Sequence, residues 1–184
     1  MRMTLKALAA LLGYPSAELQ ENASEVRRVL REEQALPKRV LEKLEPLLLG
    51  LDREDLLDLQ AAYSELFDRS RKLSLHLFEH VHGDSRERGQ AMIDLGQQYA
   101  QSGFLLDTSE LPDFVPVFLE FASCLSPSEA REMLGQPAHV FAALAERLDE
   151  RQAPYAGIFH ALLALAGASP DSEALAELQE RTPE

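Results

Sequence analysis

Hydrophobic residues recur along the whole chain at steps of three and four positions, whereas alternating runs rich in Val, Ile and Thr are scarce. Steps of three and four place apolar side chains on one face of an α-helix. The pattern therefore predicts an all-α protein, and its apolar stripes lie over residues 7–12, 19–30, 40–48, 56–67, 73–81, 92–99, 114–125, 127–134, 141–148 and 159–166. No fixed-period repeat or linker interrupts them. We expect one domain of about eight to ten helices over residues 1–170, followed by a polar C-terminal helix or tail over residues 171–184.

Residues that start and stop helices divide the pattern. Ser16, Asp52 and Ser126 precede stripes, and their side chains can accept hydrogen bonds from the free N–H groups of a first helical turn. Pro127 follows Ser126 at a position where a helix tolerates proline. Helix ends are predicted at Gly13, Gly50, Gly83 and Gly103, and an interruption is predicted near Gly135 and Pro137.

The composition is that of a globular chain with a core of its own. Of the 184 residues, 46% are hydrophobic, and the longest apolar runs are far below the roughly 18 residues that a membrane span needs. The single cysteine, Cys124, excludes an intramolecular disulfide framework and suits a reducing compartment. Because Cys124 follows apolar residues, we expect a buried thiol. The start of the chain lacks a signal-peptide cleavage site, so the expected location is the cytoplasm.

The charge distribution is asymmetric. Residues 1–100 carry 14 basic and 17 acidic side chains and residues 101–184 carry 4 basic and 14 acidic, so −3 and −10 give the net charge of −13. Such a field repels phosphate backbones and anionic lipid surfaces, which argues against nucleic-acid binding and direct membrane insertion. It either serves solubility or attracts a cationic partner.

The clearest candidate for metal chemistry is a pair of histidines. His76 and His80 lie four positions apart, which on a helix would place both imidazoles on one face. A zinc hydrolase of this type needs a carboxylate base between the histidines and a third ligand, but here Glu79 directly precedes His80. The chain also lacks the Gly-x-Ser-x-Gly nucleophile motif and the glycine-rich phosphate loops. We therefore expect no enzymatic activity, and a helical metal-dependent hydrolase using His76 and His80 is kept as an alternative.

The segment 110–121 combines two prolines, three carboxylates and three phenylalanines at the start of a predicted helix. If Asp113 caps this helix, Pro116 falls at its third position, where no backbone donor is needed. A second interpretation is compatible with the first. Glu110 and Asp113 would form an acidic rim beside Phe114 that pairs with a basic side chain while the aromatic ring holds an apolar one.

Three motifs carry a resemblance to a known family. Tyr63-Ser64-Glu65-Leu66-Phe67 resembles the Tyr-x-x-Leu-Phe helix of the redox-enzyme maturation chaperones, and residues 73–92 resemble the signature of their nitrate reductase branch, NarJ, which is related to TorD and DmsD. Residues 110–121 resemble the wider family's Glu-x-Pro-Asp-His motif, with Phe114 in place of the histidine. An aromatic residue followed by proline is usual in the NarJ branch, so roles of that histidine are not transferred. Residues 11–15, Leu-Leu-Gly-Tyr-Pro, also fit.

The resemblance implies a helical bundle of the TorD, DmsD and NarJ type and a cytoplasmic chaperone. Such a chaperone binds the N-terminal leader of the apo catalytic (alpha) subunit of a respiratory molybdenum nitrate reductase until the cofactor is inserted. The bis-molybdopterin guanine dinucleotide belongs to the client, and the chaperone binds no cofactor tightly and acts as a monomer or weak homodimer. The expected client-binding residues are Tyr63, Phe67, His80, His82, Gly83, Glu110, Pro112, Asp113, Phe114 and Phe118. A general helical peptide-binding adaptor remains a further alternative.

Overall fold

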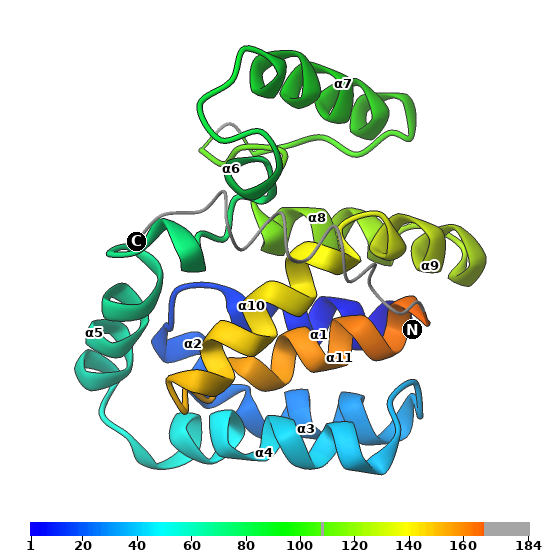
Figure 1. Ribbon diagram of the computed structural model, residues 1–184. Helices are drawn as coiled ribbons and strands as arrows, with labels where there is room; N and C mark the ends of the chain where they lie inside the picture. The colour runs from blue at the N-terminus through cyan, green and yellow to red at the C-terminus, as the bar shows by residue number, and fades with distance from the viewer. Residues whose placement is uncertain (108, 168–184) are drawn as a thin grey trace.

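The computed structural model describes residues 1–107 and 109–167, and within them it contains eleven α-helices, one short 3-10 helix and no strand (Figure 1). The predicted all-α class is thus confirmed. In chain order the elements are α1 (Arg2–Leu12), α2 (Ala17–Glu21), α3 (Ala23–Glu32), α4 (Lys38–Arg53), α5 (Leu56–Phe67), η1 (Arg71–Leu73), α6 (Leu77–Val81), α7 (Glu87–Gln101), α8 (Val115–Ser123), α9 (Pro127–Gly135), α10 (Ala138–Glu150) and α11 (Ala156–Ala166). The predicted tail over residues 171–184 lies outside the described residues.

The helix count exceeds the expected eight to ten because two predicted helices are subdivided. Asn22 ends α2 and also starts α3, which splits the helix expected behind Ser16. The helix expected over residues 73–81 is divided into η1, an extended stretch and the five-residue α6. The extended stretch pairs with the backbone ahead of α8 instead of continuing as a helix.

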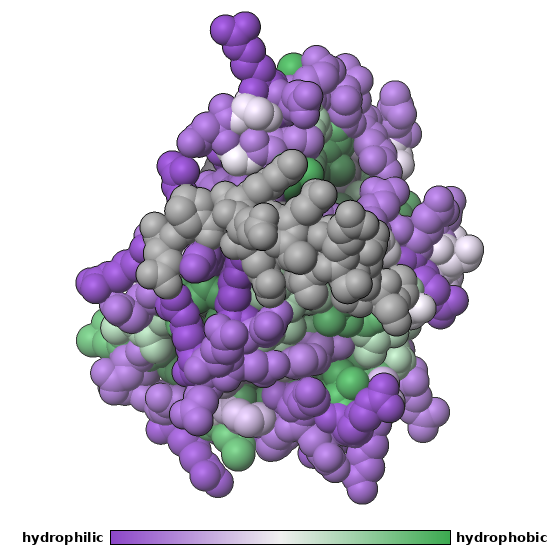
Figure 2. Space-filling model, viewed as in Figure 1, coloured by the Kyte–Doolittle hydropathy of each residue, from purple (hydrophilic) through white to green (hydrophobic). Residues whose placement is uncertain are grey.

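The two central helices, α1 and α11, carry most of the packing. Helix α1 packs against α8, and α11 packs against α10, α4 and α9. Figure 1 shows α3 and α4 on one side of this centre, α8 and α9 on the other, and α7 farthest from it. One connected set of buried apolar residues extends from α1 to α11. Outside the grey atoms, the face seen in Figure 2 is mainly hydrophilic, with smaller hydrophobic areas between the polar ones, as expected for a core closed by amphipathic helices.

Close approach of α4 and α11 depends on a glycine. A Cβ atom at Gly157 would lie 2.3 Å from the carbonyl oxygen of Lys43, well inside contact distance. Pro46 lies inside α4 near this contact zone. The absence of a side chain at Gly157 therefore sets the spacing between the two helices.

Two of the predicted caps are confirmed and one is wrong. The Ser16 hydroxyl accepts from the Leu19 N–H, and Ser126 forms a reciprocal capping box with Glu129. Asp52, in contrast, lies inside α4, which continues past Gly50. The cap of α5 is Asp55, whose carboxylate accepts from the Leu57 N–H at 2.9 Å.

The expectation of a buried thiol is also wrong. Cys124 is exposed and occupies the C-cap of α8, where the chain leaves the buried face of the helix. Its neighbour Ser123 is buried instead. Among residues 1–107 and 109–167, no helix has the length and apolar character needed to cross a membrane.

Candidate functional site

An extended segment, residues 74–76, forms the backbone of the candidate site. His76 and Phe114 make an isolated antiparallel bridge. On either side of it, the Val115 N–H donates to the Leu75 carbonyl at 2.8 Å and the Leu77 N–H donates to the Asp113 carbonyl at 3.1 Å. The start of α6 and the start of α8 are thereby joined, although 38 positions separate His76 from Phe114.

Two buried side chains hold the carbonyl groups of this region. The His80 ring nitrogen Nε2 lies 2.7 Å from the Ser74 carbonyl oxygen, and because a carbonyl only accepts, Nε2 carries the proton. Burial lowers the pKa of His80, which favours the neutral ring. From α10, the Arg147 guanidinium donates to the Lys72 carbonyl at 2.7 Å. His80 and Arg147 thus hold η1 and the segment after it in place through hydrogen bonds to the carbonyl groups of Ser74 and Lys72.

Asp113 has a different role from the one predicted. Its carboxylate is completely buried, and one oxygen accepts from the Phe78 N–H at 3.0 Å. It therefore caps the short helix α6. Helix α8 begins directly after its N-cap residue Phe114, has no side-chain cap and carries Pro116 at its second position. A carboxylate at the first turn of a helix is stabilised by the free N–H groups there. The prediction that Asp113 caps its own helix is wrong because its partner lies 35 positions earlier in the chain.

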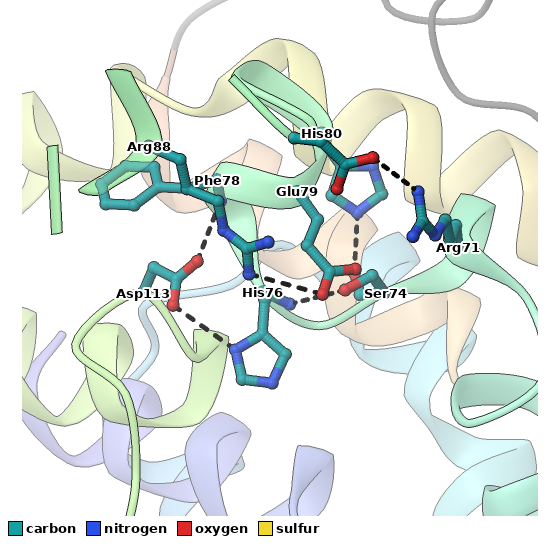
Figure 3. Close-up of polar contacts among 9 residues, drawn as sticks. Arg71, Ser74, His76, Phe78, Glu79, His80, Arg88 and Asp113 are labelled. Atoms are coloured by element: carbon teal, nitrogen blue, oxygen red, sulfur yellow. Dashed lines mark hydrogen bonds and ion pairs between the residues drawn. The ribbon is translucent and has the colours of Figure 1, made fainter. Parts of the chain in front are cut away.

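The second carboxylate oxygen of Asp113 orients His76. It lies 3.4 Å from Nδ1 of His76, which must donate because a carboxylate only accepts (Figure 3). This hydrogen bond raises the pKa of His76 against the opposing effect of burial. The His76 ring packs on the Phe114 ring with centroids 5.2 Å apart and planes at 31°. Its other nitrogen points away from Asp113 (Figure 3).

A cavity of about 650 Å³ opens in front of this network. It lies between the end of α1, α5, η1 and the start of α8. Its lining mixes aromatic rings with both signs of charge and comprises Gly13, Tyr14, Tyr63, Phe67, Asp68, Arg69, Ser70, Arg71, Ser74, Leu75, His76, Glu79, Glu110 and Phe114.

A second cavity, of about 410 Å³, adjoins the first and shares Gly13, Glu110 and Phe114 with it. The remaining lining residues come from α1, α8 and the stretch after α7, and they are Ala9, Ala10, Phe104, Leu105, Leu106, Asp107, Ser109, Pro116, Val117 and Glu120. Apart from Ser109, these residues are apolar or acidic. We refer to the two cavities together as the groove.

The aromatic wall of the groove is anchored to the core. The Tyr63 hydroxyl donates to the Leu12 carbonyl at 2.8 Å, and the Tyr63 ring contacts the rings of Tyr14, Phe67 and Tyr155. Tyr63 and Phe67 are buried, whereas 56% of the surface of Tyr14 is exposed. Tyr14 therefore presents an aromatic face to solvent on a rigid support.

Only part of the predicted site is assembled at the groove. Tyr63, Phe67, Glu110 and Phe114 line it. The others do not, and they are Pro112, Asp113, Phe118, His80, His82 and Gly83.

Each residue outside the groove has another structural environment. Phe118 is a core residue, and the Pro112 carbonyl accepts from the Tyr99 hydroxyl. His82 packs edge-on against Phe78, and Gly83 makes the turn after α6 with a φ of +54°. The acidic rim expected from Glu110 and Asp113 is wrong as stated, because buried Asp113 presents no charge to solvent.

Several groove residues escaped the sequence-based prediction. Arg69, Arg71, His76 and Glu79 line it, yet none of them is apolar, and of the four only His76 was a candidate for a role, as a metal ligand. The available signal was their position, because Arg69 and Arg71 lie between two of the family-like motifs and His76 and Glu79 lie inside the motif of residues 73–92. Arg147 supports the groove from a site 75 positions away from its partner, and no local pattern indicates such a contact.

The histidine pair is not arranged as a shared metal site. His76 lies in the extended stretch as the N-cap of α6 and turns toward Asp113, while His80 faces the Ser74 carbonyl (Figure 3). In the part of the chain that the structure describes, no group of three or more His, Cys, Asp or Glu side chains is placed to hold a metal ion. The geometry gives the metal-dependent hydrolase alternative no support.

Comparisons with known proteins agree on one family. The profile of the nitrate reductase delta subunit family matches residues 33–161. Over 173 residues the chain is 46% identical to the nitrate reductase molybdenum cofactor assembly chaperone NarJ of Escherichia coli K12, covering 94% of this chain and 73% of that protein. It is also 41% identical over 171 residues to NarW of the same strain, which is named a probable nitrate reductase molybdenum cofactor assembly chaperone. This match covers 93% of this chain and 71% of NarW.

A solved structure has the same fold. It is the crystal structure of a protein from Archaeoglobus fulgidus that is described as a proposed redox enzyme maturation protein. It superposes with a TM-score of 0.64 at 21% identity, covering 91% of this chain and 94% of that one.

Proposed function

Because this chain belongs to the nitrate reductase delta subunit family and is a nitrate reductase molybdenum cofactor assembly chaperone, we propose that its groove binds the N-terminal leader of the enzyme's catalytic subunit. The client is the apo form of that subunit, held in the cytoplasm until its bis-molybdopterin guanine dinucleotide is inserted. The chaperone itself binds no cofactor tightly and performs no catalytic chemistry.

The observation that carries this proposal is the chemistry of the groove lining. Apolar side chains from α1, α8 and the stretch after α7 lie beside the carboxylates of Asp107, Glu110 and Glu120. A short amphipathic helix with basic residues could bury its apolar face there while its cations pair with the carboxylates. The net charge of −13 would also speed the encounter with a cationic segment.

The way in which buried side chains hold the groove wall also suits a binding surface. The groove wall is held by backbone pairing and by buried His80, Asp113 and Arg147. A surface that is already ordered loses little conformational entropy when a ligand binds. Rigid aromatic side chains such as Tyr14 and Phe114 add contact area at small entropic cost.

Calorimetric titration of the full chain tests this proposal. The ligand is a synthetic peptide covering the leader of the catalytic subunit of the same organism's nitrate reductase. The control is a scrambled peptide of identical composition, which keeps the charge and destroys the amphipathic pattern. We expect the leader to bind and the scrambled peptide to bind at least tenfold more weakly, about 1.4 kcal/mol. Equal affinity for the two peptides would instead support a general peptide-binding adaptor.

A further inference from the structure

The two ends of the groove differ in charge. At one end, which we call the acidic end, the lining residues Asp107 and Glu120 carry the only charges besides the shared Glu110, and all three are carboxylates. At the other end, which we call the basic end, Arg69, Arg71 and His76 line the cavity. Among the described lining residues of the groove, cations occur only at the basic end.

Carboxylates at the basic end are partly compensated. Asp68, Glu79 and the shared Glu110 line it as well, so this end is close to neutral overall while the acidic end carries carboxylates alone, and Glu79 lies 3.5 Å from Arg88. The two arginines have partners of their own, because Arg69 lies 3.1 Å from Glu65 and Arg71 lies 3.4 Å from Asp84.

The ion pairs of Arg69 with Glu65 and of Arg71 with Asp84 can be exchanged for contacts with a ligand. All four of their side chains are at least 64% exposed, and ion pairs in such positions contribute little stability. A ligand that offers a carbonyl or carboxylate oxygen can therefore replace either partner at small cost. His76, whose pKa is raised beside Asp113, supplies a further donor at this end.

A bound helix has opposite partial charges at its ends. Its N-terminal N–H groups carry about half a positive charge and its C-terminal carbonyls about half a negative charge. The free amino group of a leader adds a full positive charge at the first end. Charge complementarity with the groove is thus different for the two possible directions of the peptide.

From this we infer that the leader lies in the groove with its N-terminus at the acidic end and its C-terminal carbonyls at the basic end. The inference rests on the proposed function and adds the direction of the client. The mature part of the client then leaves the groove beside η1 and α6, so this side of the chaperone faces the rest of the catalytic subunit.

Paramagnetic broadening measures the direction. Two leader peptides carry a nitroxide label, one at the first residue and one at the last, and each is added to the isotopically labelled full chain. We expect the first peptide to broaden the amide signals of Asp107 and Glu120, and the second to broaden those of Arg71 and His76. The reverse pattern, or equal broadening at both ends by each peptide, would overturn the direction.

A charge exchange gives a second readout. Glu120→Gln should weaken binding of the peptide with a free amino group about two- to fivefold, and should weaken the N-acetylated peptide less. Glu132→Gln, an exposed carboxylate on α9, serves as the matched control and should leave both affinities unchanged. Identical losses for both peptides in Glu120→Gln would contradict an N-terminus at the acidic end. Absence of binding by the unmodified peptide would instead overturn the proposed function together with this inference.

Discussion

Asp113 joins two helices through a single buried carboxylate. It caps α6 through the Phe78 N–H and orients His76 through Nδ1. A completely buried carboxylate is costly unless both of its oxygens are hydrogen-bonded, and here both are. The function of Asp113 is therefore to shape the groove wall, whereas the exposed carboxylate of Glu110 is available to a ligand.

Substitution of Asp113 should accordingly reduce stability. Asp113→Ala removes two charge-assisted hydrogen bonds, and we expect it to lower the free energy of unfolding by about 2–4 kcal/mol. Asp113→Asn keeps an acceptor for the Phe78 N–H and should cost less. Denaturant titration provides the measurement, with Glu110→Gln as the control that should unfold like the parent. If Asp113→Ala were as stable as the parent, the capping role would be refuted.

His76 gives the stability of the chaperone a predictable pH dependence. Its pKa is raised in the folded protein above the ordinary value of 6.5. Its contribution is therefore complete below about pH 6.5 and is lost as the pH rises through the folded-state pKa. The pH dependence that comes from buried His80 has the opposite sign. Because the pKa of His80 is lowered in the folded protein, stability falls as the pH falls and the ring becomes protonated.

The sign of the pH dependence that comes from His76 is tested by comparing the unfolding free energies of His76→Gln and the parent at about pH 5.5 and about pH 8.5. We expect the difference in unfolding free energy to be larger at the lower pH, because only there is the imidazolium bonded to Asp113 fully formed. A difference that is larger at the higher pH would show that His76 is not stabilised in its charged form.

At the scale of elements, the short helices around the groove depend on contacts from distant parts of the chain. Arg147 on α10 donates to the Lys72 carbonyl of η1. Arg147→Met keeps much of the apolar volume and removes the donor, so we expect a loss of about 1–3 kcal/mol. Faster amide hydrogen exchange over residues 71–76 should accompany this loss.

Arg151→Met is the matched control for Arg147→Met. Arg151 is exposed at the C-cap of α10, one turn after Arg147. Its variant should leave exchange over residues 71–76 unchanged. Equal exchange rates in both variants would mean that Arg147 does not hold η1.

The contact of α4 with α11 is expected to tolerate no side chain at Gly157. Gly157→Ala places a methyl group against the Lys43 carbonyl, so the helices must separate, and we expect a loss of about 1–3 kcal/mol. Gly89→Ala in α7 meets no atom within 4 Å and should be neutral or stabilising by up to about 1 kcal/mol. Thermal unfolding of the two variants measures the difference. A Gly157→Ala protein as stable as Gly89→Ala would refute the close-packing account.

Helix class and several boundaries could be predicted from the sequence because they depend on local signals. Ser16 and Ser126 precede clear stripes and cap as expected. Asp52 and Asp55 offer the same signal three positions apart, and tertiary packing of α4 decides between them. Asp113 shows the same limit, since a local capping rule cannot reveal a partner in α6.

The candidate site was predictable only in part. Tyr63, Phe67, Glu110 and Phe114 belong to motifs that resemble the family, and the structure brings them to one groove. The charged residues between α5 and α6 and the supporting Arg147 are assembled by the extended segment and by long-range contacts. Neither feature has a helical periodicity from which it could be inferred.

At the scale of the whole molecule, the groove lies where separate parts of the chain converge. Helix α1 supplies one border, α5 and η1 a second, and α8 a third. Phe114 stands at the junction of the two cavities and is only partly buried. It is therefore the side chain whose removal should damage binding most while leaving the core intact.

The most direct test is a calorimetric titration of the leader peptide into Phe114→Ala and into Leu57→Ala. Leu57 is an apolar residue of α5 that is 74% exposed and lies outside the groove, so its variant controls for loss of apolar surface. We expect Phe114→Ala to weaken binding by about 2 kcal/mol, roughly thirtyfold, and Leu57→Ala to bind like the parent. A Phe114→Ala protein that is folded and binds the leader with parental affinity would contradict the assignment of the groove as the client site.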